Sequence, residues 1–551
     1  MTRPLAACAL LAACATAQAQ PAPFRTFTSP NPEPGGTFGA ALAVLGDVDG
    51  DGVPDLLVGA PKEQAYEEPA RVQGRAYVLS GAAGEVAYAL ASPNDAPQLL
   101  AFRGEFGEAV AALGDLDGDG TGDFVVGAPG DSPEGEEGVG AAYVFSGATG
   151  TLLHALTHPP AQYQIGFGAA VADVGDVDGD GVGDVGVGAF ESGEQLACGA
   201  LGTTGLAYVF SGATGDPLYT LAPEADCETY FGQSIAGLGD VDADGRPDFA
   251  VGSLGDAGGG PFYLAGRVHV YSGATGNELY TLESPNAQNS GGFSRRYALS
   301  AISDVDGDGA RDLLVGAVNE SATPGGETYE GRAYVFSGSD GALVHTLTSP
   351  NEAFGSSFGF TVGAAGDLDD DGTPDLLVSA FDELRPTIDG AGRVYALSGA
   401  TGDALFQLDS PTPLPFGLFG LALDGTADLT GDGRPDLVVG QPDTFVGLAA
   451  NDPGRVFLYS SMPTRAESGP PPGSPTLVVA PNPAVGTARV TWDAETGPAR
   501  LVAYDMLGRE VAALEATGEA ALDVSGWAPG LYVLRLETAD GVQTQRFTVA
   551  R

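Results

Sequence analysis

The chain has 551 residues, enough for two or more domains with a large core. Its 85 glycines and ordinary hydrophobic content of 43% favour many short strands joined by tight turns. With 73 acidic and 23 basic residues the net charge is −50, which excludes nucleic acid as a partner because phosphate binding needs clustered Lys and Arg.

Residues 1–19 have the pattern of a secretory signal peptide. Arg3 supplies the charged start, residues 5–15 the apolar stretch, and Ala17-Gln18-Ala19 the cleavage signal, so we expect cleavage after Ala19. Residues 11–14 also resemble a lipoprotein box, which would make Cys14 a lipid anchor. No later apolar run reaches the length of about 18 residues that a spanning helix needs, so we expect no transmembrane segment.

A nine-residue acidic motif then recurs seven times. The first copy, residues 47–55, reads DVDGDGVPD, and the others begin at residues 115, 176, 240, 304, 367 and 428. A Phe-Gly pair stands about nine residues upstream of six copies, and the fifth has Phe293-Ser294 instead. A short apolar strand follows each motif, and a hairpin such as residues 333–348 comes after it. The starts are 61 to 68 residues apart, a period that suits a four-stranded propeller blade.

This pattern resembles the FG-GAP repeats of the integrin α-chain propeller, over about residues 24–462. The resemblance implies an all-β fold, a seven-bladed β-propeller, with calcium in the hairpin between the first and second strands of each blade. The seventh hairpin, residues 456–460, has no outer strand after it, whereas residues 26–30 (TFTSP) match residues 346–350 (TLTSP). We therefore predict that the N-terminal strand completes the last blade and removes its open edge.

Each motif is a predicted calcium loop, because alternate residues of a tight loop point oxygen ligands at one centre. Position 6 is always Gly, which permits the sharp turn. An EF-hand would need Glu at position 12, which is always Val here, so that alternative fails. The predicted ligands are the side chains at positions 1, 3, 5 and 9 and the carbonyl at position 7: Asp47, Asp49, Asp51, Val53 and Asp55; Asp115, Asp117, Asp119, Thr121 and Asp123; Asp176, Asp178, Asp180, Val182 and Asp184; Asp240, Asp242, Asp244, Arg246 and Asp248; Asp304, Asp306, Asp308, Ala310 and Asp312; Asp367, Asp369, Asp371, Thr373 and Asp375; Asp428, Thr430, Asp432, Arg434 and Asp436.

The seventh loop departs from the pattern, since Thr430 stands at position 3, and we expect it to bind calcium more weakly. The loops use 27 of the 73 acidic residues, and seven bound Ca²⁺ ions would bring the net charge from −50 to −36. The acidity is thus partly metal ligation and partly a soluble surface.

Two cysteines remain in the mature chain, Cys198 and Cys227. Both fall in loops on the same predicted face, and in an oxidising compartment we expect them to form a disulfide.

No catalytic residue is predicted, and we expect the protein not to be an enzyme. His154 and His345 occupy a repeat position held elsewhere by Tyr or Phe, His269 lies in a strand and His158 in a loop, so packing roles are favoured. No Ser has a nucleophile context and no Gly-rich segment has a phosphate-binding pattern. Recognition residues are expected on the variable loops opposite the metal loops, which carry Tyr66, Arg103, Tyr163, Phe262, Tyr263, Tyr329 and Phe445.

Residues 463–476 form a Pro/Gly/Ser-rich linker, and residues 477–551 alternate like a small Ig-like β-sandwich. Pro-Asn-Pro at 481–483, Gly-Arg at 508–509 and Gly-Leu-Tyr at 530–532 resemble the type A sorting domain of type IX secretion cargo. The resemblance implies a Gram-negative cell, the type IX machinery as a partner, and release or surface attachment. A generic Ig-like module is the alternative.

The leading hypothesis is a secreted or cell-surface adhesion protein, a monomer whose calcium-bound ring binds an extracellular protein or glycan. A polysaccharide-active enzyme is the first alternative, because propellers also carry such chemistry. A structural surface-layer component is the second.

Overall fold

The structure is a computed structural model, in which the chain divides into two compact units, residues 1–464 and 465–551. It describes residues 21–33, 35–66, 71–94, 104–131, 133, 138–158, 166–190, 204–223, 228–256, 265–288, 291–321, 328–351, 355–383, 391–414, 417–442, 453–460, 478–480, 486–491, 499–505, 509–516, 519–527, 530–538 and 541–549. The predicted signal peptide, Cys14, Cys198, Cys227 and the linker lie outside these residues, so those calls stay predictions.

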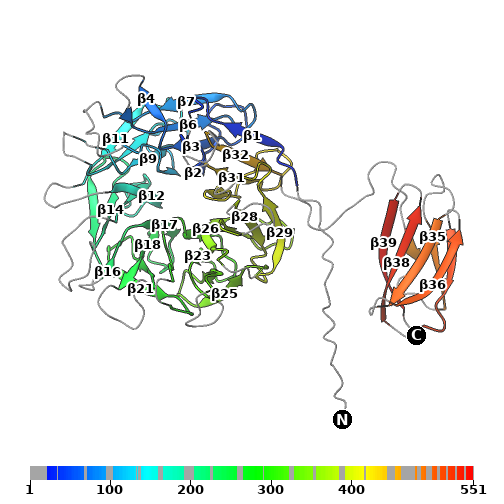
Figure 1. Ribbon diagram of the computed structural model, residues 1–551. Coiled ribbons are helices and arrows are strands. Elements are labelled where there is room, and N and C mark those ends of the chain that lie inside the picture. Colours follow the sequence, from blue (N-terminus) through cyan, green and yellow to red (C-terminus); the bar gives the residue numbers. More distant parts are fainter. Residues whose placement is uncertain are drawn as a thin grey trace, which may run out of the picture. The chain divides into compact units, whose positions relative to one another are not determined.

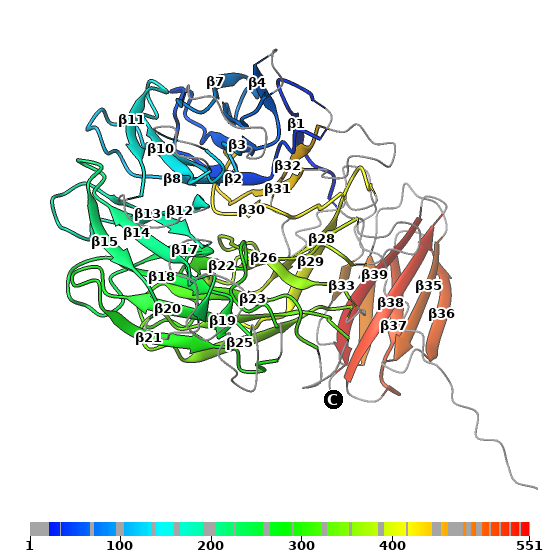
Figure 2. The same cartoon turned by 60° about the vertical axis from the view of Figure 1, so that its left-hand side comes forward.

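The first unit contains seven four-stranded antiparallel sheets within its described part, which we call blades 1 to 7. Figure 1 shows them arranged in a ring, and Figure 2 shows the ring turned by 60°. From first to fourth strand, the first three blades are β2 (Ala41–Val44), β3 (Leu56–Ala60), β6 (Arg75–Leu79) and β7 (Val86–Leu90); β8 (Ala109–Ala112), β9 (Phe124–Ala128), β10 (Ala141–Phe145) and β11 (Leu152–Leu156); β12 (Phe167–Gly175), β13 (Asp184–Ala189), β14 (Leu206–Phe210) and β15 (Pro217–Leu221).

Blades 4 to 6 repeat the same order. Their strands are β17 (Ser234–Gly239), β18 (Asp248–Ser253), β20 (Arg267–Tyr271) and β21 (Glu278–Glu283); β22 (Leu299–Ile302), β23 (Asp312–Ala317), β24 (Arg332–Phe336) and β25 (Leu343–Thr348); β26 (Phe358–Ala364), β27 (Leu376–Ala380), β28 (Arg393–Leu397) and β29 (Ala404–Asp409). Two short pairs lie in the loops, β4 (Gln64–Tyr66) with β5 (Arg71–Val72) and β16 (Glu228–Thr229) with β19 (Gly255–Asp256). The prediction of an all-β propeller is confirmed.

Blade 7 is made from both ends of the unit, as predicted. Its strands are β30 (Leu423–Asp424), β31 (Leu437–Gln441), β32 (Arg455–Tyr459) and, in the outer place, β1 (Arg25–Thr28). The register pairs Phe27 with Val456. The N-terminal strand therefore covers the edge that β32 would otherwise expose.

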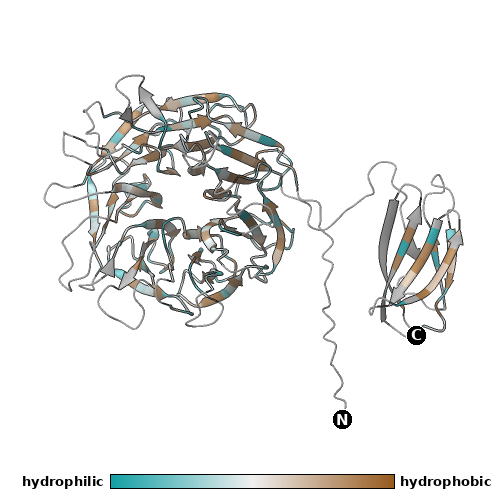
Figure 3. Ribbon diagram, viewed as in Figure 1, coloured by the Kyte–Doolittle hydropathy of each residue, from teal (hydrophilic) through white to brown (hydrophobic). Residues whose placement is uncertain are grey.

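Hydrophobic packing between blades joins the ring, as expected for strands that are apolar on both faces. The second strands are buried along their whole length, for example β3 and β9. Figure 3 shows hydrophobic stretches in brown along the strands. Buried clusters join each blade to the next, and the cluster that contains Phe27, Phe38, Leu56 and Val438 joins blade 7 to blade 1.

The Phe-Gly pairs mark the closest approach of neighbouring blades. Phe106 is fully buried and forms a backbone bridge with Gly74 of blade 1. Gly107 has φ +91°, and a Cβ on it would lie 2.3 Å from the carbonyl oxygen of Arg75, so only glycine fits. In the fifth copy Ser294 takes the place of this glycine. Its φ is also positive, at +56°, and its hydroxyl donates to the carbonyls of Ser253 and Arg267.

The second unit is a β-sandwich in its described part. One sheet holds β33 (Val478–Ala480), β34 (Thr487–Thr491) and β37 (Glu519–Asp523), and the other β36 (Glu510–Ala516), β35 (Ala499–Asp505), β38 (Gly530–Thr538) and β39 (Gly541–Val549). Residues of both sheets share one core, which includes Val490, Leu501, Leu522 and Leu534. Among the described residues of the whole chain no helix has the length and hydropathy to cross a membrane.

Candidate functional site

The acidic loops lie where the first strand of each blade turns into the second, on one face of the ring. In the first four loops the carboxylates at positions 1, 3 and 9 converge, with ligand atoms within 4.8 Å of one another: Asp47, Asp49 and Asp55; Asp115, Asp117 and Asp123; Asp176, Asp178 and Asp184; Asp240, Asp242 and Asp248. In the fifth loop the converging residues are Asp304, Asp306 and Asp308.

Backbone amides fold each loop around its own carboxylates. In the first loop Asp47 Oδ1 accepts from the amides of Gly50 and Asp51, and Asp47 Oδ2 from Gly52. Gly52 has φ +91°, which an L side chain rarely adopts. Asp49 Oδ1 accepts from the amide of Asp51, so backbone amides hold the side chains at positions 1 and 3 in place. The same bonds recur in loop 2 at Asp115.

The position 9 aspartate ties the loop to the outer hairpin of its own blade. Asp55 is fully buried; its Oδ2 accepts from the amides of Val48 and Asp49, and its Oδ1 from Gly81 at 2.9 Å. The bond to the hairpin glycine recurs in blades 2 to 6, through Asp123, Asp184, Asp248, Asp312 and Asp375.

The position 5 aspartate reaches the same hairpin through a serine that the sequence analysis did not single out. Ser80 Oγ donates to Asp51 Oδ2 at 3.3 Å, and Ser337 Oγ donates to Asp308 Oδ2 at 3.0 Å. Loops 1 to 6 are therefore bonded to the turn between the third and fourth strands of their blades. The Ser-Gly pair that recurs at this turn in the sequence could have indicated the contact.

Burial disfavours the ionised form of the carboxyl group at position 9. It raises the pKa of Asp184, Asp312 and Asp375 to about 6, although backbone amides oppose the shift. A carboxylate held out of water next to others is stabilised by a bound positive ion. The donors are all oxygens, and neither His nor Cys lies within the loops. That donor set suits a hard cation such as Ca²⁺ better than zinc or copper.

Two arginines at position 7 reach from one loop to the preceding one. Arg246 of loop 4 approaches Asp176 of loop 3, with Nη1 3.8 Å from Oδ1. Arg434 of loop 7 pairs with Asp370 of loop 6 at 2.5 Å. These contacts place a fixed positive charge between neighbouring acidic loops.

The histidines have the packing roles that the sequence favoured. His154 Nε2 lies 2.8 Å from the Gly212 carbonyl of the next blade, and His345 Nε2 lies 2.7 Å from that of Gly399. A carbonyl only accepts, so these ring nitrogens donate. Tyr88 and Tyr219 make the same bond from the same repeat position. His269 is buried against Phe231, and His158 packs on Phe167.

Of the aromatic loop residues proposed for recognition, Tyr329 lies in a described loop and is 44% exposed. Only the backbone of Tyr66 is described, in β4. Arg103, Tyr163, Phe262, Tyr263 and Phe445 lie outside the described residues. The recognition role of this set stays a prediction.

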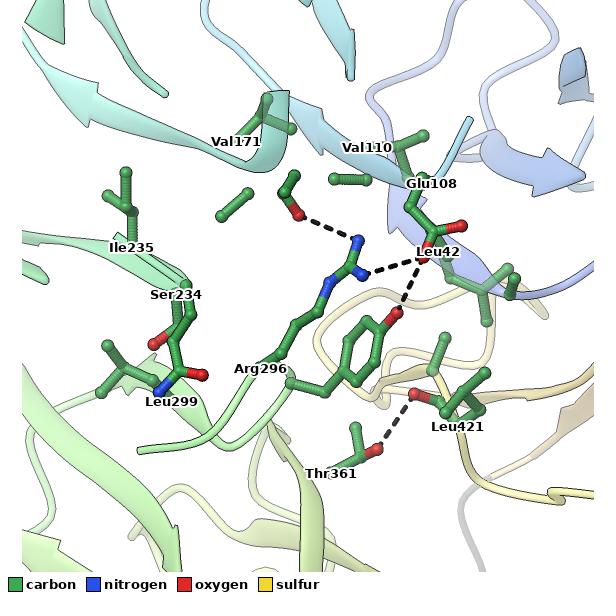
Figure 4. A pocket seen from close by; sticks show the side chains of 18 of the residues that line it. Leu42, Glu108, Val110, Val171, Ser234, Ile235, Arg296, Leu299, Thr361 and Leu421 are labelled. Carbon is green, nitrogen blue, oxygen red and sulfur yellow. Dashed lines mark hydrogen bonds and ion pairs between the residues drawn. The ribbon is translucent and has the colours of Figure 1, made fainter. Parts of the chain in front are cut away.

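A second polar cluster, which the sequence analysis missed, lies in the channel at the centre of the ring. Arg296, just before β22 of blade 5, crosses to Glu108 at the start of blade 2, with Nη1 3.0 Å from Oε1 (Figure 4). Its Nη2 donates to the Ala169 carbonyl of blade 3 at 3.1 Å. The Tyr297 hydroxyl donates to the same Glu108 oxygen at 3.4 Å. Each of these residues occurs in one repeat copy only, so the repeat pattern does not show that they meet.

Comparison with known families agrees with this geometry. Residues 38–79, 106–145 and 296–336 match the FG-GAP repeat, and residues 478–550 match the secretion system C-terminal sorting domain. The chain thus carries FG-GAP repeats and a sorting domain that marks secreted or outer-surface proteins of Gram-negative bacteria.

Individual relatives resemble the repeat region. The chain is 38% identical over 173 residues to integrin alpha-PS2 of Drosophila melanogaster, covering 28% of this chain and 12% of the relative. It is 37% identical over 163 residues to integrin alpha-4 of Xenopus laevis (29% and 15%) and 30% identical over 247 residues to integrin alpha-5 of Xenopus laevis (42% and 22%). The match thus covers less than a quarter of the length of these relatives.

Proposed function

We propose that this protein is a calcium-stabilised binding protein, exported by type IX secretion, whose propeller recognises an extracellular protein or glycan. The observation that carries the proposal is the convergence of three carboxylates in loop after loop, each bonded to the hairpin of its own blade. A cation there would fix the first, second and third strands of a blade to one another. A ring fixed in this way presents its opposite face as a rigid surface.

The predicted seven Ca²⁺ sites belong to this proposal. Calcium takes six to eight oxygen ligands, and each full loop offers four aspartates and a carbonyl. Bound ions would also remove the repulsion between neighbouring carboxylates. The seventh loop, with Thr430 in place of an aspartate, is the weakest of the set.

The ligand-binding role is supported by the similarity to integrin alpha chains and by the sorting domain. We assign recognition to the face opposite the metal loops, where the crossings between blades carry Tyr329. A monomer is supported by the closed ring, because one chain supplies all four strands of every blade.

A polysaccharide-active enzyme is the second candidate, favoured by the Glu108–Arg296–Tyr297 cluster. Glycoside hydrolysis needs two carboxyl groups beside the scissile bond, and Glu108 is the one carboxylate among the residues that line the channel cavity. Burial raises the pKa of Tyr297, so its phenol stays protonated at neutral pH and cannot accept a proton as a general base. The cluster therefore suits binding better than catalysis.

An array of glycans and matrix proteins, probed with and without calcium, tests the proposal. We expect one ligand class to bind in calcium and to be lost in chelator. Turnover of a polysaccharide, or no binding to either class in calcium, would contradict it.

A further inference from the structure

The central channel holds a cavity of about 220 Å³ whose walls come from all seven blades. Its base is a ring of aliphatic side chains, one from the first strand of each blade, among them Leu42, Val110, Val171, Ile235 and Leu299 (Figure 4). These residues stand five positions before the first aspartate of each metal loop. The base of the cavity is therefore apolar.

The wall above this base is polar and lies toward the starts of the first strands. Because the metal loops follow the ends of those strands, the polar wall lies toward the opposite face of the ring. Glu108, Gln233, Arg296 and Tyr297 line it. The Arg296 side chain is 24% exposed and that of Glu108 is 18% exposed, so the pair is only partly covered by protein.

Hydrogen-bonding capacity is left over in this wall. Glu108 uses Oε1 for both Arg296 and Tyr297, and its Oε2 has no partner among the described residues. Gln233 donates through Nε2 to the Ser294 carbonyl at 3.1 Å, which leaves its Oε1 without a described partner. Arg296 uses one N–H of Nη1 for Glu108 and one N–H of Nη2 for Ala169, and each of these nitrogens carries a second hydrogen. The wall thus offers two acceptors and further N–H donors.

The charges in the wall cancel, because Arg296 and Glu108 neutralise each other. A charged ligand would have to break that pair to be held, whereas a neutral ligand leaves it intact. Hydroxyl groups both donate and accept, so they match a wall that offers both kinds of partner. Small-molecule sites typically combine an apolar lining with a few placed polar groups.

We propose that this cavity binds a single neutral sugar unit, the terminal residue of a glycan, with its hydroxyls on Glu108, Gln233 and Arg296. A methyl substituent, as in a 6-deoxy or N-acetylated sugar, lies on the aliphatic ring. The cavity is too small for a long ligand and fits one sugar ring. This inference rests on the proposed binding function and names its ligand class and site.

Titration calorimetry on the full calcium-loaded chain tests the inference with fucose, N-acetylglucosamine, glucose, glucuronate and acetate as probes. We expect fucose or N-acetylglucosamine to bind at least tenfold more tightly than glucuronate, and acetate not to bind. Val171→Phe fills the cavity and abolishes binding, and Gln233→Leu weakens it at least tenfold. If Val171→Phe does not fold, Gln233→Leu decides.

Gln288→Leu is the matched control. Gln288 is also buried, but it bonds to the backbone of Ser321 and does not line the cavity. Its substitution lowers stability and leaves sugar affinity unchanged. Absence of binding by every neutral sugar, equal binding of glucuronate, or unchanged affinity in folded Val171→Phe overturns the inference. If the array still finds a protein ligand, the proposed function stands while the inference fails.

Discussion

Blade 7 and the other six blades reach the same four-stranded sheet with different residues. Blades 1 to 6 each have an outer hairpin whose glycine amide bonds to the position 9 aspartate. In blade 7 the outer strand β1 comes from the other end of the unit, and Thr430 replaces a loop aspartate. Hairpin continuity and the bond from loop to hairpin hold six blades, whereas pairing of distant segments holds the seventh.

The same contrast appears at the contacts between outer strands and the next blade. Tyr88, His154, Tyr219 and His345 donate to a backbone carbonyl of the following hairpin. At the closing junction, Arg25 of β1 takes this role and donates to the carbonyls of Gly81 and Ala82. A side chain at this repeat position therefore bonds to the next hairpin at six of the seven junctions, and an arginine provides the bond where the chain closes on itself.

Calcium removal should have the largest effect and act on the six complete loops. With a dissociation constant of about 10⁻⁴ M per site, a hundredfold excess of calcium adds roughly 2.7 kcal/mol at each site. We expect a chelator to lower the melting temperature by more than about 10 °C. Magnesium at the same concentration is the control. A melting temperature that is the same with and without chelator would show that no ion in the loops stabilises the fold.

Deletion of residues 24–30 should destabilise blade 7 more than any other blade. It removes β1 and exposes the edge of β32, which invites aggregation. In hydrogen exchange, amides of β32 should lose protection first, while the equivalent strand β24 of blade 5 keeps it. Equal exchange in both strands would show that the N-terminal strand does not close the ring.

Glu63→Gln should remove a pH dependence of the unfolding free energy. Blade 7 has no such dependence from its own buried side chain, because that side chain is a neutral glutamine. Glu63 is fully buried and accepts from Ser29 and Tyr77, and burial raises its pKa to about 7. Since the folded pKa lies above the unfolded value, its contribution is complete below about pH 4.5 and is lost as pH rises through 7. In blade 7 the serine that corresponds to Ser29, Ser410, donates to Gln441, a neutral side chain that stands three positions earlier in the repeat than Glu63 does.

We therefore expect Glu63→Gln to raise the free energy of unfolding at pH 8 by up to about 3 kcal/mol and to change little at pH 4. Denaturant unfolding across this range measures the difference. Gln441→Glu is the reciprocal variant and should add the pH dependence. An identical pH profile for wild type and Glu63→Gln would contradict the assignment.

Arg25→Met should have the smallest effect on stability, and it tests the side-chain bonds at the junction between blades 7 and 1. It removes two side-chain bonds to carbonyls and keeps the apolar stem, at a cost of about 1–2 kcal/mol. Urea unfolding should show this loss. Phe406→Leu is the control, because Phe406 occupies the same repeat position and donates no hydrogen bond. If Arg25→Met loses no more unfolding free energy than Phe406→Leu, Arg25 does not stabilise the closing junction.

The repeat made most of the fold predictable. Seven copies of one loop gave the blades, and the match between residues 26–30 and 346–350 gave the pairing of β1 with β32. The aspartates that converge in the loops were predictable because their spacing recurs. The hairpin serine and glycine also recur in the repeat. Their hydrogen bonds to the loop could not be predicted, because the two turns are far apart in the sequence and meet only in the folded blade.

The channel cluster was not predictable in the same way. Glu108 and Arg296 stand 188 residues apart, and the equivalent repeat positions hold unrelated side chains. Their pairing depends on the diameter of the closed ring, which no local pattern encodes. The polar exceptions at an otherwise small or apolar repeat position, Glu108 and Gln233, were the available hint.

The aspartate loops are proposed calcium sites, and a count of bound ions tests this most directly. Equilibrium dialysis with radioactive calcium on the full chain should find six sites of similar affinity and a weaker seventh. Thr430→Asp should bring the seventh site to the affinity of the others, and Asp304→Asn with Asp306→Asn should remove one. A chain that binds no calcium, or a number of bound ions that is unchanged in the loop 5 double variant, would show that the aspartate loops are not calcium sites.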